Sequence, residues 1–198
     1  MKYDQEFEVV IYDKKVDVGI IDGDNTIVII VPGQNSNIYG YNKRYLKLSN
    51  KINYKYGSTI IIFSNPFNFE NPMKDLMHII KKYAKRFNNY TLCFFGFSKG
   101  AIIGAQYATK EKEFERMVLI NGPLMINYHK TKEGINEFKG EMINFIYGSL
   151  DPSSKYVGLL SLIKKGNIKV TILENVGHNV ENEEMFLSLA DIGLFYDK

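Results

Sequence analysis

The stretch that decides the fold is Gly96-Phe97-Ser98-Lys99-Gly100, a G-x-S-x-G pentapeptide. It follows residues 90–95, whose β-branched and aromatic side chains predict a buried strand, and it precedes residues 101–108, which predict a helix. A serine at the tip of a sharp strand-to-helix turn takes a strained backbone conformation, and glycine on both sides removes side chains that would collide. We therefore interpret Ser98 as a candidate nucleophile beside the positive end of a helix.

A serine hydroxyl is a weak nucleophile near neutral pH, so it needs a neighbouring base. The chain contains three histidines. His78 lies within residues 72–87, which predict a helix with an apolar stripe, and we interpret it as a surface or boundary residue of that helix, whereas His129 lies in a polar connection. His178 follows the apolar run 168–173 and precedes a predicted C-terminal helix. Because a loop just past a strand end is a common place for a general base, we expect His178 to fill that role.

The base in turn needs an acid that orients it. Between Ser98 and His178 the chain contains a single aspartate, Asp151, which follows the strand-like run 142–146. Taken alone, an aspartate before a proline is typical of a turn residue. Taken with Ser98 and His178, the chain order Ser, Asp, His favours a catalytic role for Asp151 instead.

The segments GFSKG, YGSLDP and NVGHN, each after a predicted strand and in this order, resemble the α/β-hydrolase superfamily. The resemblance spans nearly the whole chain. It implies that Ser98 is the nucleophile and that His178 is the general base and then the acid. It also implies that Asp151 orients the imidazole and stabilises its charged form. Esterase, thioesterase, peptidase and acyltransferase chemistry all use such a triad, and the sequence does not choose among them.

The resemblance also implies an oxyanion hole built from two backbone N–H groups. Lys99 supplies one of them. The second comes from the loop after residues 26–31, where alignment selects Gln34, with Asn35 in reserve. Related enzymes usually carry a His-Gly pair in this loop, whereas this chain has Pro32-Gly33.

Strands alternate with helices along the chain after an opening hairpin of residues 7–12 and 16–22. This order predicts an α/β fold, namely a doubly wound, mostly parallel sheet with an N-terminal antiparallel hairpin and helices on both faces. The chain has 198 residues, is 45% hydrophobic and contains no low-complexity linker. We therefore expect a single α/β-hydrolase-like domain over residues 1–198.

Residues 121–140 leave room for only one short helix between two predicted strands, so we expect no inserted cap domain and an open pocket. Such a pocket suits a small acyl substrate. The candidate pocket residues are Asn35, Leu124, Met125 and His129.

Composition and charge exclude several classes of function. The net charge of +3 comes from lysines spread along the chain with no basic stripe, so nucleic-acid binding is not indicated. The single cysteine, Cys93, allows neither an internal disulfide nor a cysteine metal cluster, and no metal or organic cofactor is implied. The polar N-terminus and the absence of a long apolar run predict no membrane span and a cytoplasmic location. The oligomeric state is left open.

Two alternatives to a small serine hydrolase of ester-like substrates stay open. Asp22-Gly23-Asp24-Asn25-Thr26 matches the D-x-D-x-T pattern of the haloacid dehalogenase superfamily, which would make Asp22 the nucleophile of a magnesium-dependent phosphatase. We interpret residues 22–25 instead as a hairpin turn, because Thr26 runs straight into a predicted strand. The other alternative is a hydrolase fold that has lost catalysis and serves as a binding protein.

Overall fold

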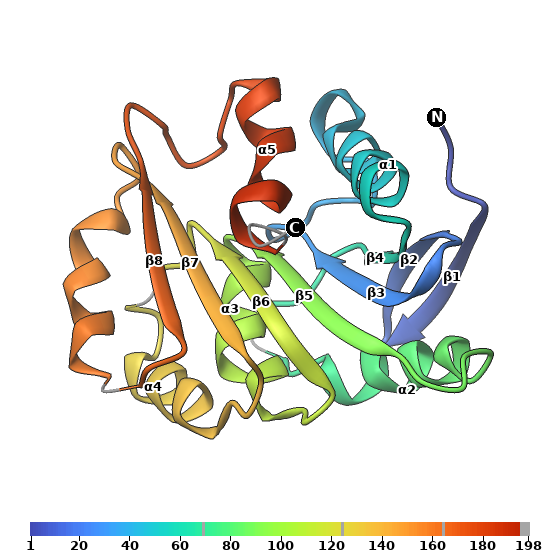
Figure 1. The fold of residues 1–198 in the computed structure, drawn as a ribbon, viewed down its shortest axis with the longest axis horizontal. Coiled ribbons are helices and arrows are strands. Elements are labelled where there is room, and N and C mark those ends of the chain that lie inside the picture. The colour runs from blue at the N-terminus through green and yellow to red at the C-terminus, as the bar shows by residue number, and fades with distance from the viewer. Residues whose placement is uncertain (69, 124, 164, 195–198) are drawn as a thin grey trace.

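The computed structural model describes residues 1–68, 70–123, 125–163 and 165–194. Over these residues the chain forms an eight-stranded sheet in the order β1-β2-β4-β3-β5-β6-β7-β8 (Figure 1). β1 pairs antiparallel with β2, and β2 pairs antiparallel with β4, whereas the other neighbours are parallel. The strands are β1 (Gln5–Ile11), β2 (Lys14–Ile21), β3 (Asp24–Val31), β4 (Ser58–Phe63), β5 (Thr91–Phe97), β6 (Phe114–Ile120), β7 (Met142–Gly148) and β8 (Ile168–Leu173).

Helices cover both faces of this sheet, because the central strands are apolar on both sides. In β3, Ile27 and Ile29 face a core shared with α2, α3 and α4, while Val28 and Ile30 face a core shared with α1 and α5 (Figure 1). All four side chains are buried. The predicted fold class is therefore confirmed. The α-helices are α1 (Arg44–Tyr56), α2 (Met73–Ala84), α3 (Lys99–Gln106), α4 (Tyr128–Glu137) and α5 (Glu183–Gly193).

One local prediction needs correction. The hairpin turn expected over residues 22–25 is wrong, because β4 lies between β2 and β3 in the sheet and these two strands do not pair. The segment is instead a tight connection that carries the chain past β4. Between β7 and β8, residues Ser154–Leu162 form a 3₁₀ helix. The two other 3₁₀ helices of the described residues are Tyr41–Lys43 and Ala108–Lys110.

The sheet places the candidate catalytic residues at one end, beyond the carboxyl ends of its parallel strands. β5, β7 and β8 run parallel, so the loops that follow them emerge at the same end of the sheet. Between β6 and β7, residues 121–140 contain α4, as expected. In the part of the chain that the structure describes, every helix is too short or too polar to cross a bilayer.

Candidate active site

Ser98 lies at the tip of a sharp turn between β5 and α3. Its backbone angles are φ 49° and ψ −111°, which a residue other than glycine adopts only under strain. The turn requires backbone segments to approach one another closely, and only glycine leaves room for this at the two flanking positions. A Cβ on Gly96 would lie 2.7 Å from the carbonyl of Gly100, and one on Gly100 would lie 2.0 Å from the Val31 carbonyl oxygen. The two glycines thus let α3 begin directly against the ends of β3 and β5.

His178 joins Ser98 to Asp151 by hydrogen bonds. Its Nε2 lies 3.0 Å from the Ser98 Oγ, and its Nδ1 contacts the Asp151 Oδ2. The Asp151 carboxylate is wholly buried, and its Oδ1 accepts a hydrogen bond from the Ser153 N–H at 2.6 Å. Residues separated by 80 and 27 positions in the chain therefore form one continuous hydrogen-bonded path.

A residue that sequence reasoning missed, Asn121, holds the loops of this path together. It follows β6, is 1% exposed and has a φ of 48°, a conformation that asparagine tolerates. Its Oδ1 accepts a hydrogen bond from the N–H of Gly148 at 2.9 Å, at the end of β7 and three residues before Asp151. Its Nδ2 donates to the carbonyl of His178 at 2.7 Å. No sequence motif marked Asn121, because its partners come from distant loops.

The loop after β3 lies against Ser98. A Cβ on Gly33 would lie 3.6 Å from the Ser98 Cβ, and Gln34 lines the same cavity as Ser98. The Asn35 N–H donates to the Asn65 carbonyl at 2.7 Å, so this reserve donor already has a partner. Among the hydrogen bonds of the described residues, none uses the Gln34 N–H. Lys99 begins α3, where N–H groups have no acceptor within the helix.

Two adjoining cavities open at this site. One of about 240 Å³ is lined by residues that include Ser98, His178 and Gln34. The other is larger, about 410 Å³, and extends past the start of α1 and α5. Five residues line both cavities, and sequence reasoning had marked none of them: Ser36, Arg44, Tyr45, Asn179 and Phe186.

Burial shifts the pKa of two of these shared residues. Tyr45 is 7% exposed, and burial raises the pKa of its hydroxyl, so the phenol stays neutral beside Gly33 and Ser36. Burial lowers the pKa of the half-buried Arg44 guanidinium. Both residues lie on the first two positions of α1, a helix whose apolar stripe carries no signal for a binding site.

The structure does not bring the predicted pocket residues into the cavity beside Ser98. Asn35 lines a separate hollow near Asp17 and Pro66. Met125 is 52% exposed, and His129 lies exposed on α4; neither lines this cavity. Leu124 lies outside the described residues. Position along the chain suggested that the segment before α4 borders the pocket. The first turns of α1 and α5 border the cavity instead.

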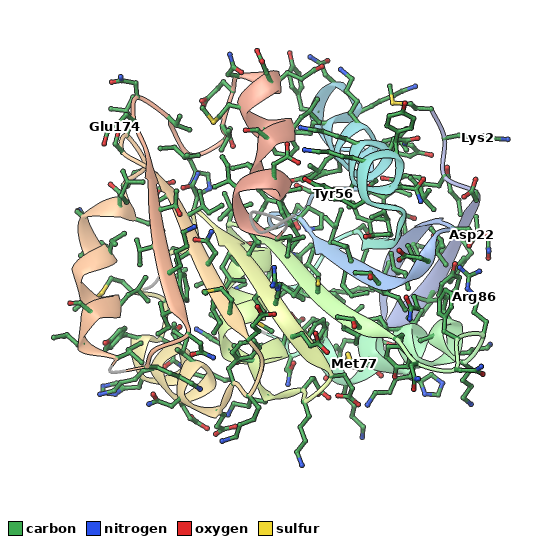
Figure 2. All side chains as sticks on the ribbon, viewed as in Figure 1. Lys2, Asp22, Tyr56, Met77, Arg86 and Glu174 are labelled. Atoms are coloured by element: carbon green, nitrogen blue, oxygen red, sulfur yellow. The ribbon has the colours of Figure 1, made fainter. Side chains whose placement is uncertain are left out.

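Asp22, the nucleophile of the phosphatase alternative, is already engaged at the opposite end of the sheet. It precedes β3, whereas Ser98 follows β5, and these strands are parallel. Its Oδ1 accepts hydrogen bonds from Tyr83 and, at 3.0 Å, from Arg86, which Figure 2 shows near it. The Tyr83 hydrogen bond, together with the hydrogen bond and charge of Arg86, outweighs burial and holds the pKa of Asp22 below its usual range. Among the described residues, no three His, Cys, Asp or Glu side chains gather as a metal site would require.

Comparisons with known proteins agree with this architecture. No model of a protein family matches the chain, and no curated protein matches it. Solved structures do match. Est1E from Butyrivibrio proteoclasticus is 12% identical with a TM-score of 0.72, and the match covers 94% of this chain and 96% of that chain. A protein from Xanthomonas campestris, described as an α/β serine hydrolase without lid, is 15% identical with a TM-score of 0.69 and coverage of 95% and 92%.

A third structure extends the likeness. Dienelactone hydrolase from Anabaena variabilis is 15% identical with a TM-score of 0.71, and the match covers 97% of each chain. At such low identity, similarity over nearly the full length establishes the fold. The chain therefore has the fold of the α/β-hydrolase superfamily.

Proposed function

We propose that this protein is a serine hydrolase of small ester-like substrates, acting as a single domain over residues 1–198 without an inserted cap. The observation that carries the proposal is the hydrogen-bonded path from the Ser98 Oγ through His178 to the buried Asp151 carboxylate. A buried carboxylate on one imidazole nitrogen fixes the tautomer whose other nitrogen can accept the serine proton. The fold supports the proposal, because Est1E and dienelactone hydrolase share it.

In the first half of the reaction, the Ser98 Oγ attacks the substrate carbonyl carbon while His178 Nε2 accepts the hydroxyl proton. Asp151 stabilises the imidazolium that forms. The carbonyl oxygen becomes an oxyanion, and the N–H groups of Lys99 and Gln34 are the donors assigned to it. The tetrahedral intermediate then collapses, His178 returns the proton to the departing alcohol, and Ser98 carries the acyl group as an ester.

In the second half, a water molecule takes the place of the alcohol. His178 accepts one proton of the water as its oxygen attacks the acyl carbon, and the same proton then returns to the Ser98 oxygen as the acid leaves. The exposed position of His178 supports this step, since 42% of its side chain is accessible to solvent. A covalent acyl-enzyme is therefore the intermediate to look for.

The test is labelling with a fluorophosphonate, which forms a stable tetrahedral adduct with an activated serine. We expect peptide mass spectrometry to find the adduct on Ser98 in the folded protein. His178→Ala should abolish labelling, because no base then accepts the serine proton. His129→Ala is the matched control and should label like the wild type, since His129 lies outside the cavity.

Two results would contradict the proposal. Labelling of Ser98 at the wild-type rate in His178→Ala would show that the histidine does not activate it. Failure of a well-folded sample to label would favour a binding protein that has kept the fold without the chemistry.

A further inference from the structure

We propose that the substrate carries an anionic group, a carboxylate or a phosphate, and that the guanidinium of Arg44 binds this group in the cavity that holds Ser98. This inference rests on the proposed hydrolase function and names its substrate class. Among the described residues that line this cavity, Arg44 is the only one with a permanent charge. It also lines the adjoining cavity, so it stands where the two meet.

The guanidinium of Arg44 has donors to spare. An arginine side chain carries five N–H groups in one plane. One of them donates to the Val180 carbonyl at 2.7 Å, and the guanidinium makes no other hydrogen bond or ion pair among the described residues. The group is half-buried, and the more distant Glu181 and Glu183 offset the cost of burying its charge only in part, because burial still lowers the pKa of Arg44. An anionic ligand would supply the missing partner.

Packing holds this guanidinium in one orientation. Its central carbon lies over the face of the Phe186 ring, 3.7 Å from the ring centroid, which is a cation–π contact. The hydrogen bond to Val180 fixes the rotation within that plane. A planar fork held in this way matches two oxygens of a carboxylate or phosphate without a large loss of side-chain entropy.

The nearby carboxylates of Glu181 and Glu183 attract the Arg44 charge, but neither forms a hydrogen bond or ion pair with it among the described residues. Glu183 lines the larger cavity, but it forms an ion pair with Lys47 at 2.6 Å. Glu181 lines the larger cavity and not the one that contains Ser98. Arg44 is also the first residue of α1, so the positive end of that helix adds to its potential. Arg44 is therefore the charged group that faces a substrate in the Ser98 cavity, and it favours a negative substrate group there.

Arg44 has a second role that a test must separate from substrate binding. Val180 has a φ of 49°, which is unusual for a β-branched residue, and its carbonyl is held by Arg44 two residues after His178. Removing Arg44 can therefore disturb the histidine loop. A neutral ester reports that disturbance, whereas the ratio between an anionic and a neutral ester reports charge recognition.

The experiment uses two matched pairs of esters that differ in charge. In the first pair, 4-carboxyphenyl acetate and 4-carbamoylphenyl acetate, the charge is on the leaving group. In the second, monophenyl adipate and its terminal amide, the charge is on the acyl group. A further ester, in which a phosphate replaces the carboxylate of 4-carboxyphenyl acetate, shows which of the two anions the protein prefers. The measured quantity is the anionic-to-neutral ratio of kcat/KM.

We expect the wild type to prefer the anionic ester in at least one pair. Arg44→Gln should lower that ratio by roughly tenfold to a hundredfold, mainly through KM, because charge-assisted hydrogen bonds are lost. Arg44→Lys should keep part of the preference. Lys43→Gln removes an equal charge from an exposed neighbour outside both cavities and should change the ratio less than about twofold. An unchanged ratio in Arg44→Gln for both pairs would overturn the inference.

Calorimetry separates this inference from the proposed function, because binding needs no turnover. We expect the wild type to bind 4-hydroxybenzoate or adipate more tightly than the corresponding amide, and Arg44→Gln to remove that difference. Arg44-dependent binding without any ester turnover would overturn the hydrolase proposal alone. Turnover of neutral esters without Arg44-dependent binding would overturn the anionic-substrate inference alone.

Discussion

Replacing Gly100 by alanine should damage both stability and activity. The added Cβ would lie 2.0 Å from the Val31 carbonyl oxygen and 2.7 Å from that of Pro32, whereas ordinary contacts begin at 3.4 Å. The start of α3 must then move away from the end of β3 by more than an ångström. Both obstructing atoms are backbone, so no side chain can rotate aside, and we expect the upper end of overpacking costs, about 3 kcal/mol.

That loss is measurable by thermal and urea unfolding. For a chain of 198 residues, about 3 kcal/mol corresponds to a fall in Tm of roughly 6–12 °C. The same movement shifts Ser98 relative to the Gln34 loop, and a displacement of about 1 Å lowers a rate by roughly a hundredfold. We therefore expect fluorophosphonate labelling of Gly100→Ala to slow by about that factor.

Gly158→Ala is the matched control, since a Cβ there meets no atom within 4 Å. Its Tm and its labelling rate should stay close to those of the wild type. If Gly100→Ala unfolded at the wild-type temperature and labelled at the wild-type rate, the argument that close backbone approach builds this turn would be refuted.

Three further predictions concern the same framework. Asn121→Ala removes the hydrogen bonds to the loops of Asp151 and His178, so it should lower stability by about 2–3 kcal/mol. It should also lower kcat, with a smaller effect on KM. An unchanged kcat for a neutral ester would contradict this. Asp151→Asn should keep the fold, as circular dichroism can check, but lower kcat by roughly 10³–10⁴-fold, because an amide favours the wrong imidazole tautomer. Asp191→Asn should make stability less dependent on pH. Burial alone would raise the pKa of Asp191, but hydrogen bonds from Tyr56, Lys55 and Lys51 outweigh it and lower the pKa to about 2. The ionised carboxylate therefore stabilises the fold above about pH 4, by about 1 kcal/mol after solvent screening, and this contribution disappears as the pH falls towards 2. Urea unfolding of both proteins at pH 7 and near pH 2 measures it, and an equal difference at both values would refute it.

The strands and the nucleophile turn could be predicted because their signals are local. A buried central strand such as β3 needs apolar side chains on both faces, and Gly96 and Gly100 are required by the backbone within a few residues of Ser98. The place of β4 between β2 and β3 could not be predicted in the same way. Strand order depends on which edges meet in space, and residues 22–25 have the composition of a turn in either arrangement.

For the site, the sequence by itself determined which residue types could carry chemistry: one G-x-S-x-G serine, a single aspartate between Ser98 and His178, and a histidine after the last strand. Only the tertiary structure decided that these groups share hydrogen bonds, that Asn121 ties their loops together, and that Arg44 lines the cavity rather than Met125. The physical reason is that parallel strands bring distant loops to one edge of the sheet, and contacts between such loops leave no periodic or motif signal along the chain.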